Sequence, residues 1–313
     1  MKNKNLYKIS FKRIVLVALF LVFSTALSAQ SDTIRNDSIN KKRLNTVIYG
    51  SVGFYSASLV VLYYVWYKDN MALPFHFIND SQYWLQIDKM GHMTTAYTLS
   101  NYGYWLLRWS NVPENKSIGY GALMGFGAMT VIEILDGFSS DYGASWGDMA
   151  ANTIGTGLFA GQQLLWHEQR FRLKFSYHPS DYCQCRPEKL GENHLQRILK
   201  DYNGHTYWLS ANIYSFLKKE SKFPSWINVA VGYGGKGLLG ETSNPEYDND
   251  GNPIPRFERV RQYYVSMDID WTRIKTNSNF LKFLFKGLSF VKLPFPTLEY
   301  NKEDQLVFHW LYF

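Results

Sequence analysis

Acidic, imidazole and amide side chains recur at helical spacing between residues 88 and 152, within sequence that is otherwise mostly apolar. Three pairs have the three- or four-residue spacing of neighbours on one helix face. These pairs are Asp88 with His92, Glu133 with Asp136, and Asp148 with Asn152. If the three segments pack together, the four carboxylates, the imidazole and the amide would suit acid–base chemistry or divalent-metal binding.

This pattern gives two groups of candidate site residues. The candidates for catalysis or for ligation of a divalent metal are His92, Glu133, Asp136 and Asp148. The candidates for a structural or ligand-binding role are Asp88, Lys89, Ser145 and Asn152.

Most candidates also have a purely structural interpretation. Asp88 could be a helix N-cap, and Ser145 with Asp148 fits the capping-box pattern at a helix start. His92 could be a core histidine that is satisfied by a carbonyl. Glu133 and Asp136 differ, because they lie in the last turn of an apolar helix that Gly137 ends, where the helix dipole disfavours negative charge by roughly 0.3–1 kcal/mol. Compensation by Lys89, by His92 or by a bound cation is therefore expected.

The net charge of +7 does not indicate a nucleic-acid partner. Five basic residues lie before residue 30 with no acid among them, and they leave only +2 for the rest of the 313-residue chain. Together with the apolar run Ile14–Leu27 and small residues up to Ala29, they predict a signal peptide over residues 1–29. An uncleaved anchor is the alternative, although 14 apolar residues fall short of the ~20 that span a bilayer.

We predict an α+β protein with an N-terminal helical bundle and an antiparallel, β-rich C-terminal region. A polar spacer (residues 30–45) precedes the membrane-associated bundle (residues 46–170), whose helices are expected over 47–66, 88–108, 117–135 and 146–167. Gly121 with Gly125, and Gly157 with Gly161, place small residues on one helix face and predict close helix packing.

A polar linker is predicted over residues 171–204, and it holds Cys183 and Cys185, the chain's two cysteines. With His178 and His194 they could bind zinc, but the spacing matches known zinc sites poorly. A strained disulfide or two free thiols is the alternative interpretation.

The final region, residues 205–313, changes to strand periodicity. Apolar and polar residues alternate in residues 262–271, and rougher runs cover 206–216, 227–233 and 306–313, so about five strands are expected. Residues 277–288 predict a short amphipathic helix. The aromatic ending of the chain resembles the C-terminal strand of outer-membrane barrels, but an open sheet edge cannot face lipid. Helices, a partner or further strands would have to complete such a sheet.

The segment from about residue 80 to 167 resembles a family of small envelope lipoproteins, the YfiM-type family. The resemblance rests on D88-K89-x-x-H92, E133-x-x-D136 and S145-W146-x-D148. The segment is also similar, more distantly, to VanZ-like membrane proteins, through the DK-x-x-H start, the later glutamate and D148-x-x-A-N152. The resemblance implies a helical, envelope-associated domain and no established activity. Unlike the small lipoproteins, the chain has no cysteine after its apolar run.

Three functions remain open. The first is a non-enzymatic protein of a Gram-negative cell envelope, at the outer membrane or its periplasmic face, whose polar residues are structural or bind a ligand. The second is a metal- or acid–base-dependent hydrolase of lipid or cell-wall material, with His92 as general base. The third is an outer-membrane assembly factor that binds a partner protein through its C-terminal strands. Membrane lipid is the expected partner in each case.

Overall fold

The computed structural model describes residues 38–313, apart from 69, 72, 73, 219 and 249, and the predicted signal peptide lies outside this range. Four long helices precede the sheet. They are α2 (Lys41–Leu62, continued by the π-helical turn η1, Tyr63–Tyr67), α3 (Ile87–Trp109), α4 (Glu114–Gly137) and α5 (Trp146–Trp166). The predicted helices are thus present, with α2 beginning at Lys41, inside the predicted spacer.

The helix ends have local causes. Asn40 caps α2 by accepting a hydrogen bond from the Arg43 amide, and Pro113, with its fixed φ, directly precedes α4. The Ser145 hydroxyl accepts from the Asp148 amide at 3.2 Å at the start of α5. The N-cap interpretation of Ser145 is therefore confirmed.

Glycines allow α3 to approach its neighbours closely. A Cβ atom on Gly125 would lie 2.4 Å from the Ala96 carbonyl oxygen, so the prediction for the first glycine pair is confirmed. The prediction of close packing at the second pair is wrong, because Gly157 and Gly161 face open space. The glycine of α5 that meets α3 is Gly155, whose added Cβ would lie 2.0 Å from the Met93 carbonyl oxygen.

Six antiparallel strands form the main sheet, in the order β3-β4-β5-β6-β7-β8. They are β3 (Phe171–Tyr177), β4 (His205–Asn212), β5 (Ile227–Lys236), β6 (Val260–Ile269), β7 (Phe295–Asn301) and β8 (Gln305–Tyr312). The α+β prediction is confirmed. The prediction of about five strands missed β7 and β3, and β3 lies within the predicted linker.

Short elements complete the described chain. The helices are α6 (Pro187–Leu190), α7 (His194–Lys200) and α8 (Asn279–Gly287), the last within the predicted amphipathic segment. The 3-10 turns are η2 (Tyr83–Gln86), η3 (Asp181–Gln184), η4 (Tyr202–Gly204), η5 (Ile213–Phe216), η6 (Trp271–Arg273) and η7 (Leu288–Phe290). A two-stranded parallel sheet joins β1 (Phe77–Ile78) to β2 (Ala144–Ser145).

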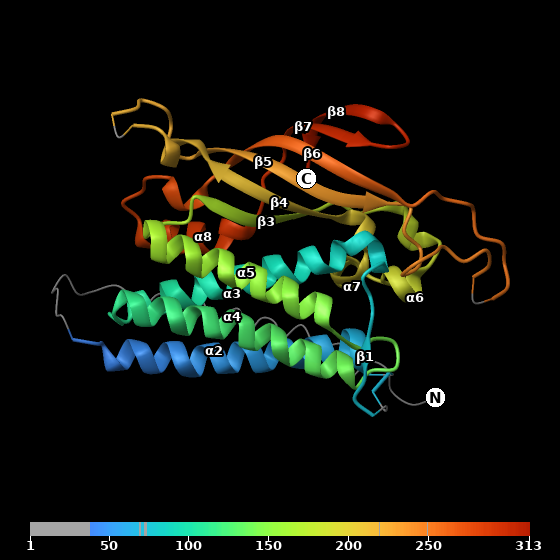
Figure 1. The fold of residues 1–313 in the computed structure, drawn as a ribbon, viewed down its shortest axis with the longest axis horizontal. Helices are drawn as coiled ribbons and strands as arrows, with labels where there is room; N and C mark the ends of the chain where they lie inside the picture. Colours follow the sequence, from blue (N-terminus) through green and yellow to red (C-terminus); the bar gives the residue numbers. More distant parts are fainter. Residues whose placement is uncertain (1–37, 69, 72–73, 219, 249) are drawn as a thin grey trace.

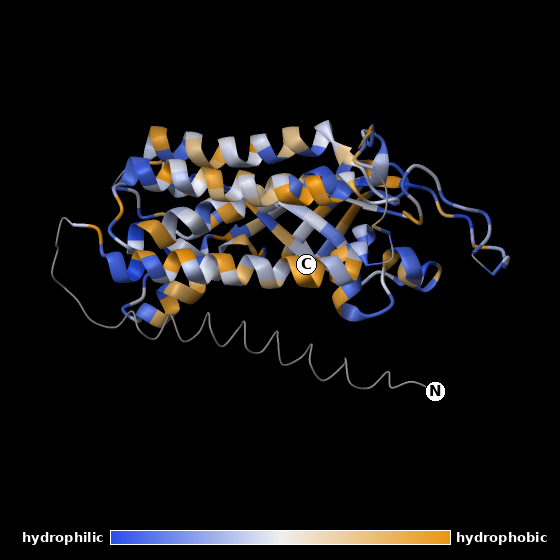
Figure 2. Cartoon of the chain, turned by 90° about the horizontal axis from the view of Figure 1, so that it is seen from below, coloured by the Kyte–Doolittle hydropathy of each residue, from blue (hydrophilic) through white to orange (hydrophobic). Residues whose placement is uncertain are grey.

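The elements stack in layers (Figure 1). The main sheet covers α3 and α5, and α4 and then α2 lie farther from the sheet. Two helical stretches, Lys41–Tyr67 and α4, are long and apolar enough to cross a membrane. Few residues of the first stretch are buried, and Figure 2 shows hydrophobic residues along the helices.

The main sheet buries its polar face. Along β6, Ser266 and Asp268 are buried whereas Val265 and Met267 are exposed. The buried face holds ion pairs, and Lys174 Nζ lies 2.7 Å from Asp268 Oδ2 with both side chains fully buried. The predicted alternation in β6 is therefore present, with the apolar face outward.

The sheet also curls around this polar face. Tyr312 of β8 donates a hydrogen bond to the Tyr264 hydroxyl of β6 at 2.6 Å. Its hydroxyl also lies 3.1 Å from Thr206 Oγ1 of β4, so strands separated by three others meet across the interior. The β3 edge is in part covered by a backbone bridge between Phe175 and Val291.

Candidate functional site

The two-stranded sheet brings the loop before α3 against the start of α5. Pairing of Ile78 with Ser145 places Asp80 next to Ser145, whose hydroxyl donates to Asp80 Oδ1 at 2.6 Å. Both residues are buried. Asp80 and Ser145 belong to a group of neighbouring side chains that we call the polar cluster. Its members are Asp80, Asp88, Lys89, His92, Glu133, Asp136, Ser145 and Asp148.

Lys89 bridges two carboxylates of the cluster. Its Nζ atom donates to Asp80 Oδ2 at 2.6 Å and to Asp148 Oδ1 at 3.0 Å. Burial tends to raise the pKa of Asp80, but its hydrogen bonds with Asp148, Lys89 and Ser145 lower it below the usual value. Burial and the charge of Asp88 raise the pKa of Asp148. Of the three alternatives for compensating Glu133 and Asp136, the pairing with Lys89 is therefore wrong, because the carboxylate partners of Lys89 are Asp80 and Asp148.

His92 lies between two acids from different helices. Its Nε2 atom lies 4.0 Å from Asp88 Oδ1, and its Nδ1 atom lies 3.2 Å from Glu133 Oε1. His92 Nδ1 and Glu133 Oε1 are both buried, and neither atom has a hydrogen-bond partner in the described chain. Burial alone would lower the pKa of His92, but the surrounding carboxylates, Asp88 first, raise it above its usual value. The expectation of a core histidine satisfied by a carbonyl is not met.

Glu133 and Asp136, in the last turn of α4, have separate partners. Glu133 Oε2 accepts a hydrogen bond from the Ser145 amide at 3.0 Å. In the predicted capping box, the side chain of Asp148 would accept this hydrogen bond instead. Asp136 Oδ1 accepts from the Tyr67 hydroxyl at 2.6 Å. Tyr67 lies in η1, so the end of the α2 stretch closes one side of the cluster.

Asp88 faces the sheet side of the cluster. Its Oδ1 atom accepts from the Tyr202 hydroxyl at 2.7 Å. The predicted N-cap role of Asp88 is wrong, since α3 begins at Ile87 after Gln86. Asn152 is buried one turn beyond Asp148, with neither amide atom hydrogen-bonded.

Three side chains bring potential metal ligands together. Asp88, His92 and Asp148 each place one ligand atom within 4.8 Å of the others. Mixed imidazole and carboxylate ligands suit ions such as Zn²⁺, Mn²⁺ or Fe²⁺. The cluster contains five carboxylates, whereas its basic groups are Lys89 and the imidazole of His92. This charge imbalance and the two unpaired atoms of His92 and Glu133 suit a bound cation.

Sequence reasoning did not identify Asp80, Tyr67 or Tyr202 as site residues. Asp80 was visible only as an acid in an aromatic loop, and its role depends on the β1–β2 pairing. Tyr202 is 114 residues away from the Asp88 that it contacts. A lysine that lies among apolar residues needs acidic partners, and this requirement of Lys89 is the sequence signal that could have pointed to Asp80.

The cysteine region does not form a comparable centre. Cys183 and Cys185 are free thiols, and the Cys183 thiol contacts the Ser180 carbonyl oxygen. Within the described ranges, the group with metal-ligand geometry is Asp88, His92 and Asp148, without His178 or His194. The structure thus agrees with the free-thiol alternative.

Comparison with known proteins supports the assignment of the helical segment to the cell envelope. Residues 76–162 match the family model DUF2279, described as a predicted periplasmic lipoprotein. The match covers less than a third of the chain and spans all eight residues of the polar cluster. No curated protein and no solved structure matches the chain. The helical segment is therefore similar to an envelope lipoprotein family of unknown function, and the likeness to VanZ-like proteins stays a prediction.

Proposed function

We propose that the protein is a membrane-associated cell-envelope protein whose helical domain binds a divalent cation in the polar cluster. The observation that carries this proposal is the contact between His92 Nδ1 and Glu133 Oε1. These buried atoms lie 3.2 Å apart without a hydrogen bond, beside the three ligand atoms of Asp88, His92 and Asp148. A cation would balance the surplus of carboxylates and would take a lone pair from the imidazole.

The position of the cluster favours a structural or ligand-binding role for the cation. Its side chains come from α3, α4, α5, β2 and the loop before α3, and Tyr67 and Tyr202 add contacts from η1 and η4. A cation held there would join these elements, and binding to the folded state alone would stabilise the fold.

The test is thermal unfolding of the full chain in detergent after chelation, with Zn²⁺ or Mn²⁺ then added. We expect one of the ions to raise the unfolding temperature of the wild type, and to raise that of His92→Gln or Asp148→Asn by much less. The matched controls are His167→Gln and Asp141→Asn, whose side chains are largely or partly exposed and lie outside the cluster. An equal response in all five proteins would contradict the proposal.

A hydrolase is the second candidate, because His92 lies between Asp88 and Glu133 as a general base between acids would. The discriminating variant is Glu133→Gln. An enzyme would lose turnover of lipid or cell-wall substrates while its unfolding temperature stayed the same. In the cation-binding account this variant shows a lower unfolding temperature in the presence of the cation.

A further inference from the structure

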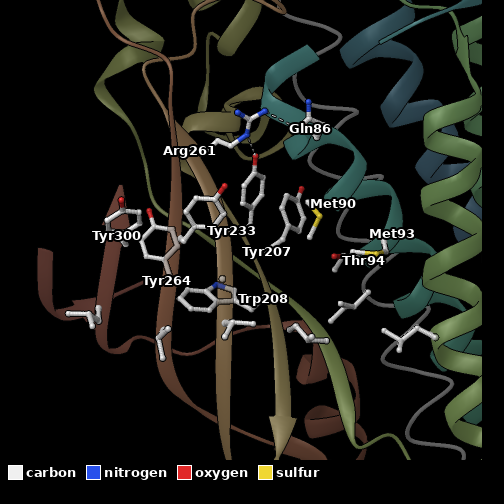
Figure 3. A pocket seen from close by; sticks show the side chains of 18 of the residues that line it. Gln86, Met90, Met93, Thr94, Tyr207, Trp208, Tyr233, Arg261, Tyr264 and Tyr300 are labelled. Atoms are coloured by element: carbon white, nitrogen blue, oxygen red, sulfur yellow. Dashed lines mark hydrogen bonds between the residues drawn. The ribbon is translucent and has the colours of Figure 1, made fainter. Parts of the chain in front are cut away.

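A groove runs between α3 and the apolar outer face of the main sheet (Figure 3). Its volume is about 840 Å³, within the range of about 300–1,000 Å³ that small-molecule sites have. Met90, Met93 and Thr94 line it on the helix side. Lys89 and His92 point to the polar cluster instead, so α3 separates the groove from that cluster.

The sheet side of the groove is built from two rows of side chains that cross the strands. Strand pairing places tyrosines of β4, β5, β6 and β7 next to one another, and aliphatic residues of the same strands form the adjacent row. The tyrosine row is Tyr207, Tyr233, Tyr263 and Tyr300. The aliphatic row is Leu209, Val231, Val265 and Leu298.

One cationic side chain stands at the tyrosine end of the groove. Arg261 precedes Tyr263 by two residues on β6, so its side chain lies on the same face. Its guanidinium donates to the Tyr233 hydroxyl and to Gln86 Oε1, both at 3.1 Å (Figure 3). Among the described residues, no carboxylate lies within ion-pairing distance of Arg261.

The groove-lining residues on this face of β6 are therefore, in order, the cationic Arg261, then Tyr263 and then the aliphatic Val265. A membrane lipid has the same order: an anionic headgroup, a polar interfacial region and an acyl chain. Tyrosines favour such interfaces because one end of the ring is apolar and the other hydrogen-bonds. An arginine offers its donors to a phosphate in a fixed planar fork.

We propose that this groove binds one anionic phospholipid, with its phosphate at Arg261 and an acyl chain along Val231, Val265 and Leu298. The exposed aliphatic row then faces hydrocarbon rather than water. The Arg261 guanidinium then gains an anionic partner, which the described part of the chain does not provide. This site is independent of the cation in the polar cluster.

The test uses phosphatidylglycerol with a photoreactive group in its acyl chain, and phosphatidylcholine with the same chain, on the full chain in detergent. We expect phosphatidylglycerol to label Met93, Val231 or Val265 in preference to phosphatidylcholine. Arg261→Gln should reduce labelling by phosphatidylglycerol at least fivefold, to the level of phosphatidylcholine. Val231→Trp, which fills the groove from a half-exposed position, should abolish labelling by both lipids.

Arg256→Gln is the matched control, because Arg256 is highly exposed and lies in the loop before β6. Circular dichroism and thermal unfolding of each variant separate loss of binding from loss of the fold. Labels that map outside the groove would overturn the proposal. So would equal labelling by the two lipids, or labelling that Arg261→Gln leaves unchanged.

Discussion

Lys89 donates a 2.6 Å hydrogen bond to Asp80, a residue that sequence spacing alone does not connect to the helices of the cluster. The same ammonium group contacts Asp148, so the single positive charge of Lys89 is shared between two buried carboxylates. Replacement by methionine would leave both acids without their cation. We expect Lys89→Met to lower the free energy of unfolding by about 3 kcal/mol, measured by chemical denaturation.

Lys189→Met is the control for Lys89. Lys189 also faces two acids, Asp141 and Glu241, but about a third of its side chain is exposed. We expect Lys189→Met to lower the free energy of unfolding by at most about 1 kcal/mol. Equal losses in the two variants would show that Lys89 is no more than a surface ion-pair partner.

Gly155 sets the distance between α5 and α3. An added Cβ atom would meet the Met93 carbonyl oxygen at 2.0 Å, and this backbone atom cannot move aside as a flexible side chain would. Gly155→Ala should therefore lower the free energy of unfolding by about 1–3 kcal/mol. Gly157→Ala faces open space two residues later and should gain roughly 0.5–1 kcal/mol from its lower backbone entropy. The opposite order of stability would contradict the described packing.

His205 should make the protein sensitive to acid. Burial lowers its pKa to about 4, its Nε2 lies 2.9 Å from the Ile198 carbonyl oxygen, and its Nδ1 faces the Tyr207 hydroxyl. The unfolded chain therefore binds a proton between pH 6.5 and 4 that the folded chain does not, and stability falls as the pH drops through this window. The loss attributable to His205 should reach about 3 kcal/mol at pH 4.

The measurement for His205 is the free energy of unfolding between pH 7 and 4. His205→Gln should show a smaller decrease over this range, whatever its stability at pH 7. An unchanged slope in His205→Gln would show that the ring is already charged in the folded state.

The buried polar face of the sheet depends on charge pairing. Lys174 and Asp268 are both fully buried, and Asp268 also accepts from the Ser210 hydroxyl at 2.6 Å. Lys174→Met should cost about 3–5 kcal/mol because it leaves the Asp268 carboxylate buried without its cation. The double variant Lys174→Met with Asp268→Leu should recover most of that loss in denaturation measurements. A double variant as unstable as the single one would mean that burial of the charge is not the cause.

Local sequence patterns predicted the long helices and four of the six strands of the main sheet, but not the orientation of the sheet. The alternation around Val265 and Ser266 predicts a strand, and it is the same whichever face is buried. The long-range ion pair of Lys174 with Asp268 decides that the polar face lies inside. Strand β3 was missed because Arg172 and Lys174, which are buried in it, made the segment resemble a polar linker.

In the candidate site, too, local sequence patterns predicted some residues, whereas long-range contacts determined the others. Helical spacing brings Asp88 together with His92, and Ser145 is the N-cap that its sequence context predicts. Asp80 and Tyr202 could not be predicted, because their positions depend on pairing between segments far apart in the chain. Local periodicity therefore identified which helices carry the site and left its remaining partners unknown.

The metal content of the purified full chain tests the central claim most directly. Elemental mass spectrometry should be applied to the wild type, to His92→Gln and Asp148→Asn, and to the controls His167→Gln and Asp141→Asn, all purified without chelator. The account predicts about one divalent ion per chain in the wild type and both controls, and a clear loss in the two cluster variants. No ion in any of these proteins, or an ion that both cluster variants retain, would contradict it.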